Sequence, residues 1–437
     1  MVWSPGVSCT PGSRGRPGSG WGRWLAPIAA LLSCAIAPAV DPTPAEVAAR
    51  DAPTVVLISF DGTPPDAVRD PDLGAFAEVA RRGVVATKLV PVFPTNTFPN
   101  HVTLVTGVAP EVHGIVGNVF LDPERGEFRY SDDPSWIEVE PIWSIAARHS
   151  VVSAAFHWVG SEGAWRTGRG PRYWKRFDAG TPEREKVEQI LAWLDLPEAR
   201  DRPRLVTSWF RGGDRTGHLR GPRSEAVRRA LREQDRALAL LIRGLQDRGA
   251  FASTTLILVS DHGMAAVERR VDLPAALRRA GVEASVRGAG GFAILSLRGG
   301  PGDAGRAVAA ARGLGLEAWA REEAPPTLRL GHPRFGDVVV LAPPGTAIQP
   351  SGLLRPAMRG SHGYRPEVPG MEALFLALGR GARPGTTFGE VRAVDVAPTV
   401  LALLGIPVPG WMEGEPIPEL APVGRGAASA LMTGDTR

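Results

Sequence analysis

The chain has 437 residues, 43% of them hydrophobic and 22% charged, which is typical of a globular protein with a large buried core and excludes a disordered or fibrous chain. The formal net charge is only +4, and three of the positive charges, Arg14, Arg16 and Arg23, precede Cys34. The rest of the chain is therefore close to neutral, and we expect no nucleic-acid binding. Cys9 and Cys34 are the only cysteines, so the chain after Cys34 can form no internal disulfide.

Residues 1–34 have the pattern of a signal peptide or a lipoprotein leader. A basic stretch precedes the apolar run "WLAPIAALLSCAIAPA", which is short for a membrane span and ends in small residues. The tetrapeptide "LLSC" ending at Cys34 also fits a bacterial lipobox, in which the cysteine is lipidated. We therefore expect export, either to the periplasm or as a lipoprotein anchored to the membrane at Cys34. The alternative is an N-terminal extension of a cytosolic protein. Residues 35–50 are predicted to be a linker.

Two continuous apolar runs predict buried strands that end in acidic or imidazole side chains. "TVVLISF" at 54–60 leads directly into Asp61, and the strand predicted from Thr254 to Ser260 leads into Asp261 and His262. Open α/β sheets bind their ligands at the carboxyl ends of the strands. The sequence therefore predicts a site at this edge of the sheet.

The run "PVFPTNTFPNHVTLVTG" at 91–107 is rich in hydroxyl and amide side chains and shows neither a helical nor a strand period. Its composition is that of a surface loop broken by prolines. The alternative is a turn that carries a nucleophile.

Between the two strands, an amphipathic helix is predicted around Val227 to Leu245, and it closes at Gly249. This alternation of strand and helix predicts a doubly wound α/β sheet flanked by helices. Residues 265–360 are richer in glycine and proline and are predicted to be a smaller inserted subdomain. The alternation resumes with a strand in "EALFLALG" and a helix around "AVDVAPTVLALLG". We expect one catalytic domain over 51–420 and a C-terminal tail over 421–437.

Six oxygen and nitrogen side chains lie at predicted strand ends and turns, in the motifs "SFDG", "GGDRTGH", "SDHG" and "GSHGY". They are Asp61, Asp214, His218, Asp261, His262 and His362. A single Asp-x-x-x-His pair is usually a loop with a satisfied histidine, but several motifs with glycine beside each ligand are harder to explain in that way. Zinc accepts imidazole and carboxylate together, and two such ions can assist phosphoryl transfer.

With these motifs, the sequence resembles the nucleotide pyrophosphatase/phosphodiesterase family of the alkaline phosphatase superfamily, from about Val55 to Ile417. The matching stretches are "LISFDG", "PVFPTNTFPNHVTLVTGVAPEVHGIVGN", "EPIW", "WVGSE", "DRTGH", "SDHGM" and "GSHGY". The resemblance implies an alkaline-phosphatase-like fold and two Zn²⁺ per chain. One ion would be held by Asp61, Thr97, Asp261 and His262, and the other by Asp214, His218 and His362.

The resemblance also assigns roles around the turn at 91–107. Thr97 matches the nucleophile, which forms a phosphoenzyme and is itself a zinc ligand. Asn118 matches the donor to a phosphate oxygen, and Phe98 matches a ring on which a base stacks. The implied activity is zinc-dependent hydrolysis of phosphodiester or pyrophosphate bonds, with nucleotides as the expected substrates.

Each of these assignments has a plainer alternative. Thr95 would be the nucleophile if the turn were shifted by two residues, and Phe98 could belong to the core. His101 and His113 are expected to be structural hydrogen-bonding residues. Asp235 lies in the apolar stripe of its helix and is either buried near the site or on a solvated flank. The aromatic residues that either line the pocket or pack elsewhere are Trp158, Tyr173 and Trp174.

The competing activities are phosphomonoester and phosphonate hydrolysis within the same superfamily. Related monoesterases carry a Lys-x-Arg pair that binds the extra phosphate charge, and the corresponding segment here, "AAFHWVGSEGAW", has none. We therefore expect diesters to be preferred. An arginine from the inserted subdomain, or Arg166 or Arg169, would reverse this preference if it reached the site.

Overall fold

The structure is a computed structural model that describes residues 52–300, 302–351 and 356–420. The predicted leader with Cys34, the linker 35–50 and the tail 421–437 lie outside the described residues. Within those described ranges, no helix combines the length and the apolar character that a membrane span requires.

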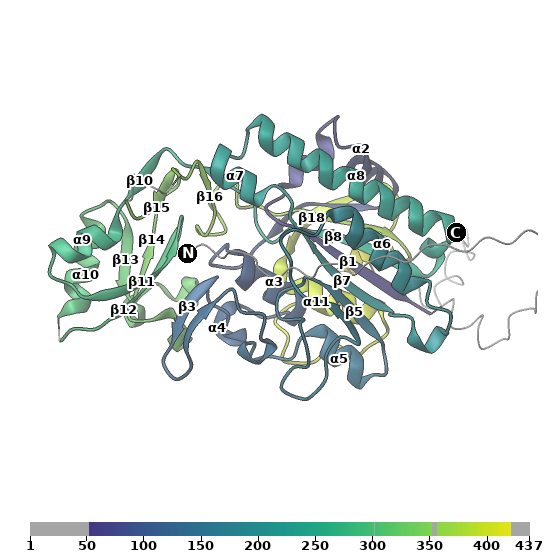
Figure 1. Cartoon of the computed structure of the whole chain (residues 1–437), viewed down its shortest axis with the longest axis horizontal. Coiled ribbons are helices and arrows are strands. Elements are labelled where there is room, and N and C mark those ends of the chain that lie inside the picture. Colours follow the sequence, from purple (N-terminus) through teal and green to yellow (C-terminus); the bar gives the residue numbers. More distant parts are fainter. Residues whose placement is uncertain (1–51, 301, 352–355, 421–437) are drawn as a thin grey trace, which may run out of the picture. The chain divides into compact units, whose positions relative to one another are not determined.

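A large, mostly parallel sheet forms the centre of the fold (Figure 1). Every strand pair is parallel except the two pairs that β17 makes with β2 and β8. In spatial order its eight strands are β18 (Thr386–Arg392), β2 (Val84–Val90), β17 (Phe375–Gly379), β8 (Thr254–Val259), β1 (Thr54–Phe60), β7 (Leu205–Phe210), β5 (Ser153–Phe156) and β6 (Tyr173–Lys175). The predicted α/β class is confirmed. The antiparallel direction of β17 could not be predicted, because its apolar sequence is like that of the parallel strands.

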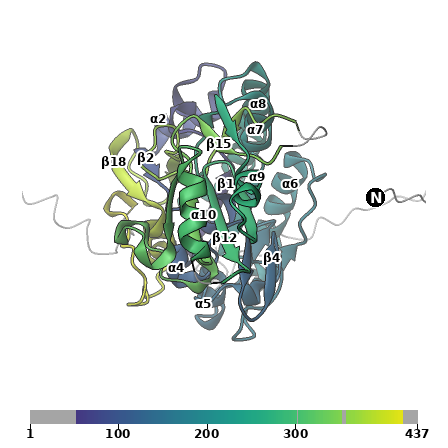
Figure 2. The same cartoon turned by 90° about the vertical axis from the view of Figure 1, so that its left-hand side faces the viewer.

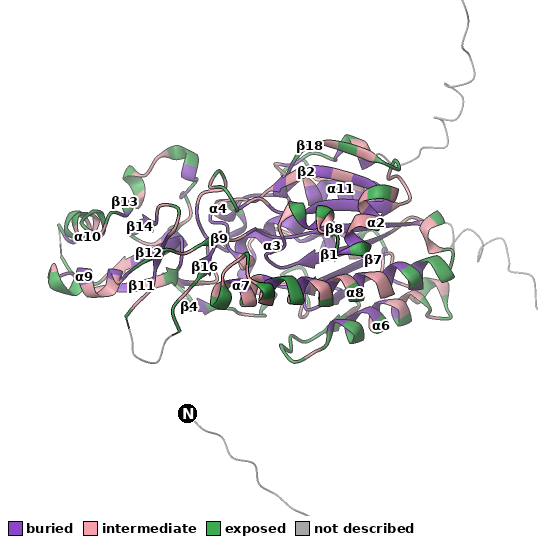
Figure 3. Cartoon of the chain, turned by 90° about the horizontal axis from the view of Figure 1, so that it is seen from above, coloured by how far each residue is buried: buried purple, intermediate pink, exposed green. Residues whose placement is uncertain are grey.

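Helices cover both faces of this sheet because alternate residues of each buried strand point in opposite directions. Val55 and Leu57 of β1 pack with the helices α3 (Thr97–Thr106), α5 (Ile142–Arg148) and α11 (Val396–Leu403). Val56 and Ile58 pack with α2 (Gly74–Arg82), α6 (Glu183–Leu194) and α8 (Glu225–Asp247). Figure 3 shows exposed outer turns on α6 and α8 and buried strands beneath them.

Helix α8 confirms the amphipathic helix predicted between the two strands. Ser224 caps it by accepting a hydrogen bond from the backbone N–H of Val227. Asp235 on this helix accepts hydrogen bonds from the N–H groups of Ala75 and Phe76, at 2.8 and 3.0 Å. It therefore caps the start of α2, which is a half-buried structural role.

Of the two alternatives for the stretch 91–107, the surface loop is wrong over its second half, which forms the buried helix α3. Every residue of this helix from Pro99 to Thr106 is buried. A helix that is buried on all sides has no polar face, and the 3.6-residue period that reveals surface helices is then absent. The helix ends at Gly107, whose φ of 70° is the left-handed conformation that glycine adopts easily.

A second sheet of four strands is built from β11 (Ala284–Ala289), β12 (Phe292–Leu297), β14 (Val338–Leu341) and β13 (Glu317–Ala320), in that spatial order. Helices α9 (Leu273–Arg279) and α10 (Asp303–Arg312) cover one face, which Figure 2 views from the helix side. The hairpin of β3 (Val119–Asp122) and β4 (Gly126–Arg129) packs on the other face, through Phe120 and Phe128 against Phe292 and Ile294. This sheet lies within the segment 265–360, whose status as a separate subdomain stays a prediction.

Short pairs of strands connect the second sheet to the central one. β9 (Ala265–Ala266) pairs with β16 (Gly360–Ser361), and β10 (Arg269–Val271) pairs with β15 (Thr346–Ile348). β16 leads directly into His362. Two further short helices, α4 (Pro110–His113) and α7 (Asp214–Arg220), follow α3 and β7 along the chain.

Candidate active site

The predicted ligands gather where the central strands end. Asp61 follows β1, and Asp261 with His262 follows β8 by one residue. Asp214 is the first residue of α7 after β7, and His218 lies one helical turn further on. His362 follows β16. Its ring stacks on that of His262, with the ring centroids 3.7 Å apart, so His362 also lies beside the end of β8.

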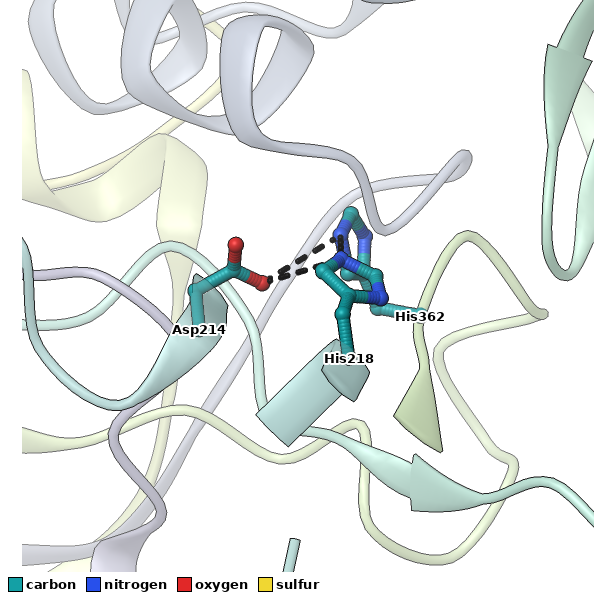
Figure 4. A group of neighbouring side chains, drawn as sticks. All are labelled: Asp214, His218 and His362. Carbon is teal, nitrogen blue, oxygen red and sulfur yellow. Dashed lines mark hydrogen bonds and ion pairs between the residues drawn. The ribbon is translucent and has the colours of Figure 1, made fainter. Parts of the chain in front are cut away.

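One group of side chains consists of Asp214, His218 and His362 (Figure 4). Asp214 Oδ1 lies 3.3 Å from His218 Nε2 and 3.5 Å from His362 Nε2. The two Nε2 atoms are themselves only 3.1 Å apart. These three atoms converge on one point from a helix and from a strand end that are far apart in the sequence.

A second group surrounds His262. Its Nε2 atom lies 3.1 Å from Asp261 Oδ2, 3.7 Å from Asp61 Oδ1 and 3.2 Å from Thr97 Oγ1. Asp214 also offers a ligand atom to the group of Asp61 and His262. The structure therefore brings all seven predicted ligands together, and Asp214 lies between the two groups instead of in one alone.

Hydrogen bonds to backbone carbonyls fix the proton on each of the three histidines. The Nδ1 atoms of His218, His262 and His362 lie 2.8–2.9 Å from the carbonyl oxygens of Gly360, Gly263 and Thr95. A carbonyl can only accept, so each Nδ1 carries a proton, and each ring in its neutral form presents a lone pair at Nε2. The Nε2 atoms of His218 and His362, 3.1 Å apart, would direct lone pairs at each other in the neutral rings, and these repel unless a proton or a metal cation lies between them.

The carboxylates at the site are short of hydrogen-bond donors. Asp61 Oδ1, Asp214 Oδ1 and Asp261 Oδ2 are buried without a hydrogen-bond partner. Burial, together with the charges of Asp261 and Asp214, raises the pKa of Asp61 well above its usual value. Burial opposes ionisation of Asp214, but the nearby imidazole of His218 outweighs it and lowers the pKa of Asp214. Buried carboxylates and imidazole lone pairs around one space fit divalent cations with mixed nitrogen and oxygen ligands.

Thr97 is the first residue of α3, and its hydroxyl faces the metal-ligand groups. The hydroxyl of Thr95 is fully buried elsewhere, where it donates to the carbonyl of Tyr364 at 3.0 Å and accepts from the N–H of Gly363 at 2.9 Å. Of the two threonines considered, Thr97 is therefore the one whose hydroxyl is placed among the predicted ligands.

Asn118 and Phe98 lie beside Thr97. Asn118 Oδ1 accepts a hydrogen bond from the backbone N–H of Phe98 at 2.8 Å, which orients the amide and leaves its NH₂ group able to donate. The Phe98 ring meets Phe128 and Tyr130 edge to face, with centroids 5.9 and 5.3 Å apart. Phe98 therefore packs against the hairpin and also lines the cavity.

The site opens into a cavity of about 740 Å³ between the central strand ends and the second sheet. Sequence reasoning did not identify Tyr130, Phe177, Trp209 and Arg287 in its wall, because none of them lies in a motif or at a predicted strand end. Arg287 comes from β11 in the predicted insertion, where an arginine near the site was considered. Neither Arg166 nor Arg169 lines this cavity.

The remaining candidates have structural surroundings. His101 Nδ1 lies 2.8 Å from the carbonyl oxygen of Thr97, and Nε2 lies 2.8 Å from Ser59 Oγ. His113 Nδ1 accepts from the N–H of Ile115, and burial lowers the pKa of His113 to about 3. Among the three aromatic candidates, Trp158 reaches the cavity wall, whereas Tyr173 and Trp174 do not.

Comparison with known proteins gives a consistent result. Residues 55–365 match the sequence model of the family described as type I phosphodiesterase / nucleotide pyrophosphatase. A Schizosaccharomyces pombe protein named as an uncharacterized pyrophosphatase/phosphodiesterase is 40% identical over 219 residues, which cover 48% of this chain and 45% of that protein. Mouse ectonucleotide pyrophosphatase/phosphodiesterase family member 1 is 34% identical over 229 residues, which cover 51% of this chain and 25% of that protein. The chain thus matches less than half the length of these curated relatives.

A solved structure of murine ectonucleotide pyrophosphatase/phosphodiesterase 5 superposes with a TM-score of 0.75 at 26% identity. The superposition covers 82% of this chain and 96% of the murine one, and the shared architecture is the alkaline-phosphatase-like fold. An inactive threonine-to-alanine variant of the same murine protein, solved in complex with AMP, matches equally well. Since the family's sequence model spans well over half of the residues, this chain belongs to the type I phosphodiesterase/nucleotide pyrophosphatase family.

Proposed function

We propose that the protein is a zinc-dependent hydrolase that cleaves phosphodiester or pyrophosphate bonds, with nucleotides as its substrates, through a covalent intermediate on Thr97. The observation that carries this proposal is the position of the Thr97 hydroxyl, 3.2 Å from His262 Nε2 and beside buried carboxylate oxygens that have no donor. A hydroxyl at the start of a helix and next to such a group of side chains supports the proposed role of a nucleophile that a metal activates.

Two zinc ions would be held as the family resemblance implies. Asp61, Thr97, Asp261 and His262 would bind one, and Asp214, His218 and His362 would bind the other. Three imidazole nitrogens among carboxylates suit zinc better than magnesium, which prefers oxygen ligands. Bound there, zinc would lower the pKa of the threonine hydroxyl and counter the charge that builds up on the phosphoryl oxygens.

The protein's own side chains account for the order of events. Thr97 Oγ forms a bond to phosphorus, the bond to the leaving oxygen breaks, and the first product leaves with a proton. Water then hydrolyses the phosphothreonine ester, which restores the hydroxyl and releases the second product. Throughout, the NH₂ group of Asn118 would donate to a nonbridging oxygen, where negative charge increases in the transition state.

The wall of the cavity supports a diester substrate. Phe98 and Tyr130 offer apolar ring faces for the organic group that a diester carries in addition to its phosphate. Glu127 pairs with both Arg287 and Arg129, through its Oε2 and Oε1 atoms at 2.7 and 2.5 Å. One carboxylate thus pairs with both arginines that line the cavity and offsets one of their two positive charges. The names of the relatives and the AMP complex of the murine protein support nucleotides.

The second candidate is a phosphomonoesterase or phosphonate hydrolase, and the observation that favours it is the presence of Arg287 in the cavity wall. Purified protein assayed with thymidine 5′-p-nitrophenyl phosphate, p-nitrophenyl phosphate, phosphonoacetate and p-nitrophenyl sulfate separates these activities. We expect kcat/KM to be highest for the nucleotide diester. A preference for p-nitrophenyl phosphate or phosphonoacetate would contradict the diester assignment, while leaving the metal ligands and Thr97 in place.

We further propose that the protein is exported, to the periplasm or as a lipoprotein anchored at Cys34. The sequence of residues 1–34 and the prefix "ecto" in the names of several relatives support export. Fractionation of a Gram-negative host that expresses the whole chain tests it. We expect membrane-bound wild type and released Cys34→Ser, whereas wild type in the cytoplasm would contradict export and wild type soluble in the periplasm would contradict the anchor.

A further inference from the structure

The first turn of α6 holds the end of β7 through a buried ion pair. Lys186, only 1% exposed, pairs with Glu183 Oε2 at 2.9 Å and donates to the backbone carbonyl of Trp209, also at 2.9 Å. Glu183 Oε1 accepts from the backbone N–H of Arg211 at 3.0 Å and from its Nε at 3.1 Å. The backbone on both sides of Phe210 is therefore fixed by side chains of one helix.

Trp209, held in this way, reaches the predicted metal ligand on the neighbouring strand. Its indole N–H donates to Asp61 Oδ2 at 2.9 Å. The other carboxylate oxygen, Asp61 Oδ1, has no hydrogen-bond partner and lies 3.7 Å from His262 Nε2. The indole thus occupies one oxygen of Asp61 and leaves the other directed into the ligand group.

The ammonium group of Lys186 also lies over the indole, 4.7 Å from its ring centroid. A cation on the face of an aromatic ring attracts electron density and is itself stabilised by the ring. In a buried site this polarisation makes the indole N–H more positive and strengthens the hydrogen bond that it donates. The lysine charge is thereby coupled to a carboxylate that it does not touch.

We propose that Trp209, supported by Lys186, is a positioning residue for metal binding: it fixes the Asp61 carboxylate so that only Oδ1 is presented to the ion. The inference rests on the proposed function, because it presupposes that Asp61 binds zinc. When a residue that orients a metal ligand by a hydrogen bond is changed, the metal affinity of the site usually falls about 10–100-fold.

The test is a zinc titration of Trp209→Phe without any substrate. Phenylalanine keeps an aromatic ring in the cavity wall and over Lys186 but removes the N–H donor. With free zinc set by a competing chelator, the wild type should bind two ions, and Trp209→Phe should weaken one of them about 10–100-fold and leave the other within about twofold. In an Asp61→Ala background the same substitution should add little, because its partner is already absent.

Trp165→Phe is the matched control. Trp165 also donates its indole N–H, to the carbonyl of Ile137 at 2.9 Å, but it does not line the cavity. It should leave both zinc affinities unchanged. Lys186→Met, checked for folding by circular dichroism, should weaken the same ion as Trp209→Phe by a smaller factor.

The outcomes separate the two proposals. Wild-type zinc affinity in Trp209→Phe, or equal weakening of both ions, would overturn the positioning role and leave the proposed function intact. A wild-type protein that binds no zinc would contradict the proposed function, and the positioning role with it.

Discussion

Thr97 and Thr95 lie two residues apart, and the surroundings of their hydroxyls differ completely. That of Thr95 is used by the backbone of residues 363 and 364, whereas that of Thr97 faces His262. Thr97→Ala should lower kcat on the order of 10³-fold or more and weaken zinc retention, because it removes both the proposed nucleophile and a proposed zinc ligand. Thr97→Ser should keep measurable activity, since the hydroxyl remains. Steady-state kinetics and zinc analysis of both variants check this.

The control for that series is Thr95→Ala. Loss of two hydrogen bonds in the core should lower the melting temperature, but the folded protein should still turn over. An inactive Thr95→Ala beside an active Thr97→Ala would show that the assigned nucleophile is wrong by two residues.

The side chain of Asn118 has two parts with different expected roles, one structural and one catalytic. Its Oδ1 atom holds the N–H of Phe98, and only its NH₂ group is available to a phosphate oxygen. Asn118→Ala should lower kcat about a hundredfold, as removal of a single transition-state donor does in other hydrolases. Asn118→Asp keeps the acceptor for Phe98 but has no NH₂ donor, so its kcat should fall at least as far. A wild-type rate in Asn118→Asp would refute the donor role.

The strands β1 and β8 show which parts of the site can be predicted from single elements. Each is a run of apolar residues buried on both faces, so its limits and the ligand that follows it, Asp61 or Asp261, can be identified without a structure. Trp209 cannot be identified in this way. Its importance depends on β7 being the neighbour of β1 and on α6 packing beneath it, and both are facts of sheet order that no local pattern encodes.

The hairpin of β3 and β4 gives an element-scale test of substrate preference. Glu127 on β4 pairs with Arg129 and Arg287, which line the cavity, and offsets part of their charge. Glu127→Gln should release both charges and raise kcat/KM for p-nitrophenyl phosphate relative to the nucleotide diester by about two- to fivefold, as expected for a partly exposed ion pair. The gain should diminish at high salt.

Glu124→Gln, in the turn of the same hairpin, is the control for this change. It removes the same charge but does not pair with either arginine, so the ratio of the two activities should not move. An unchanged ratio in Glu127→Gln as well would show that Arg287 and Arg129 do not contact the substrate phosphate.

The whole molecule combines residues from widely separated segments into one site. Asp61 and His362 are some three hundred residues apart in the sequence. Asp61 follows β1 of the central sheet, whereas His362 follows β16 of a separate strand pair and stacks on His262 beside it. The α/β class could be predicted because strand and helix patterns alternate along the chain. The buried helix α3, the reversed strand β17 and the position of Asp214 between both groups could not, because each depends on burial or on tertiary neighbours and not on a local period.

Whether the protein is a zinc-dependent diesterase is tested by the metal content of the purified protein, determined together with its diesterase activity. We expect about two zinc per chain, loss of activity when a chelator removes them, and recovery with Zn²⁺ but much less with Mg²⁺. The wild type should also lose activity in proportion to the zinc removed. Full activity in a preparation shown to contain no metal would contradict the account.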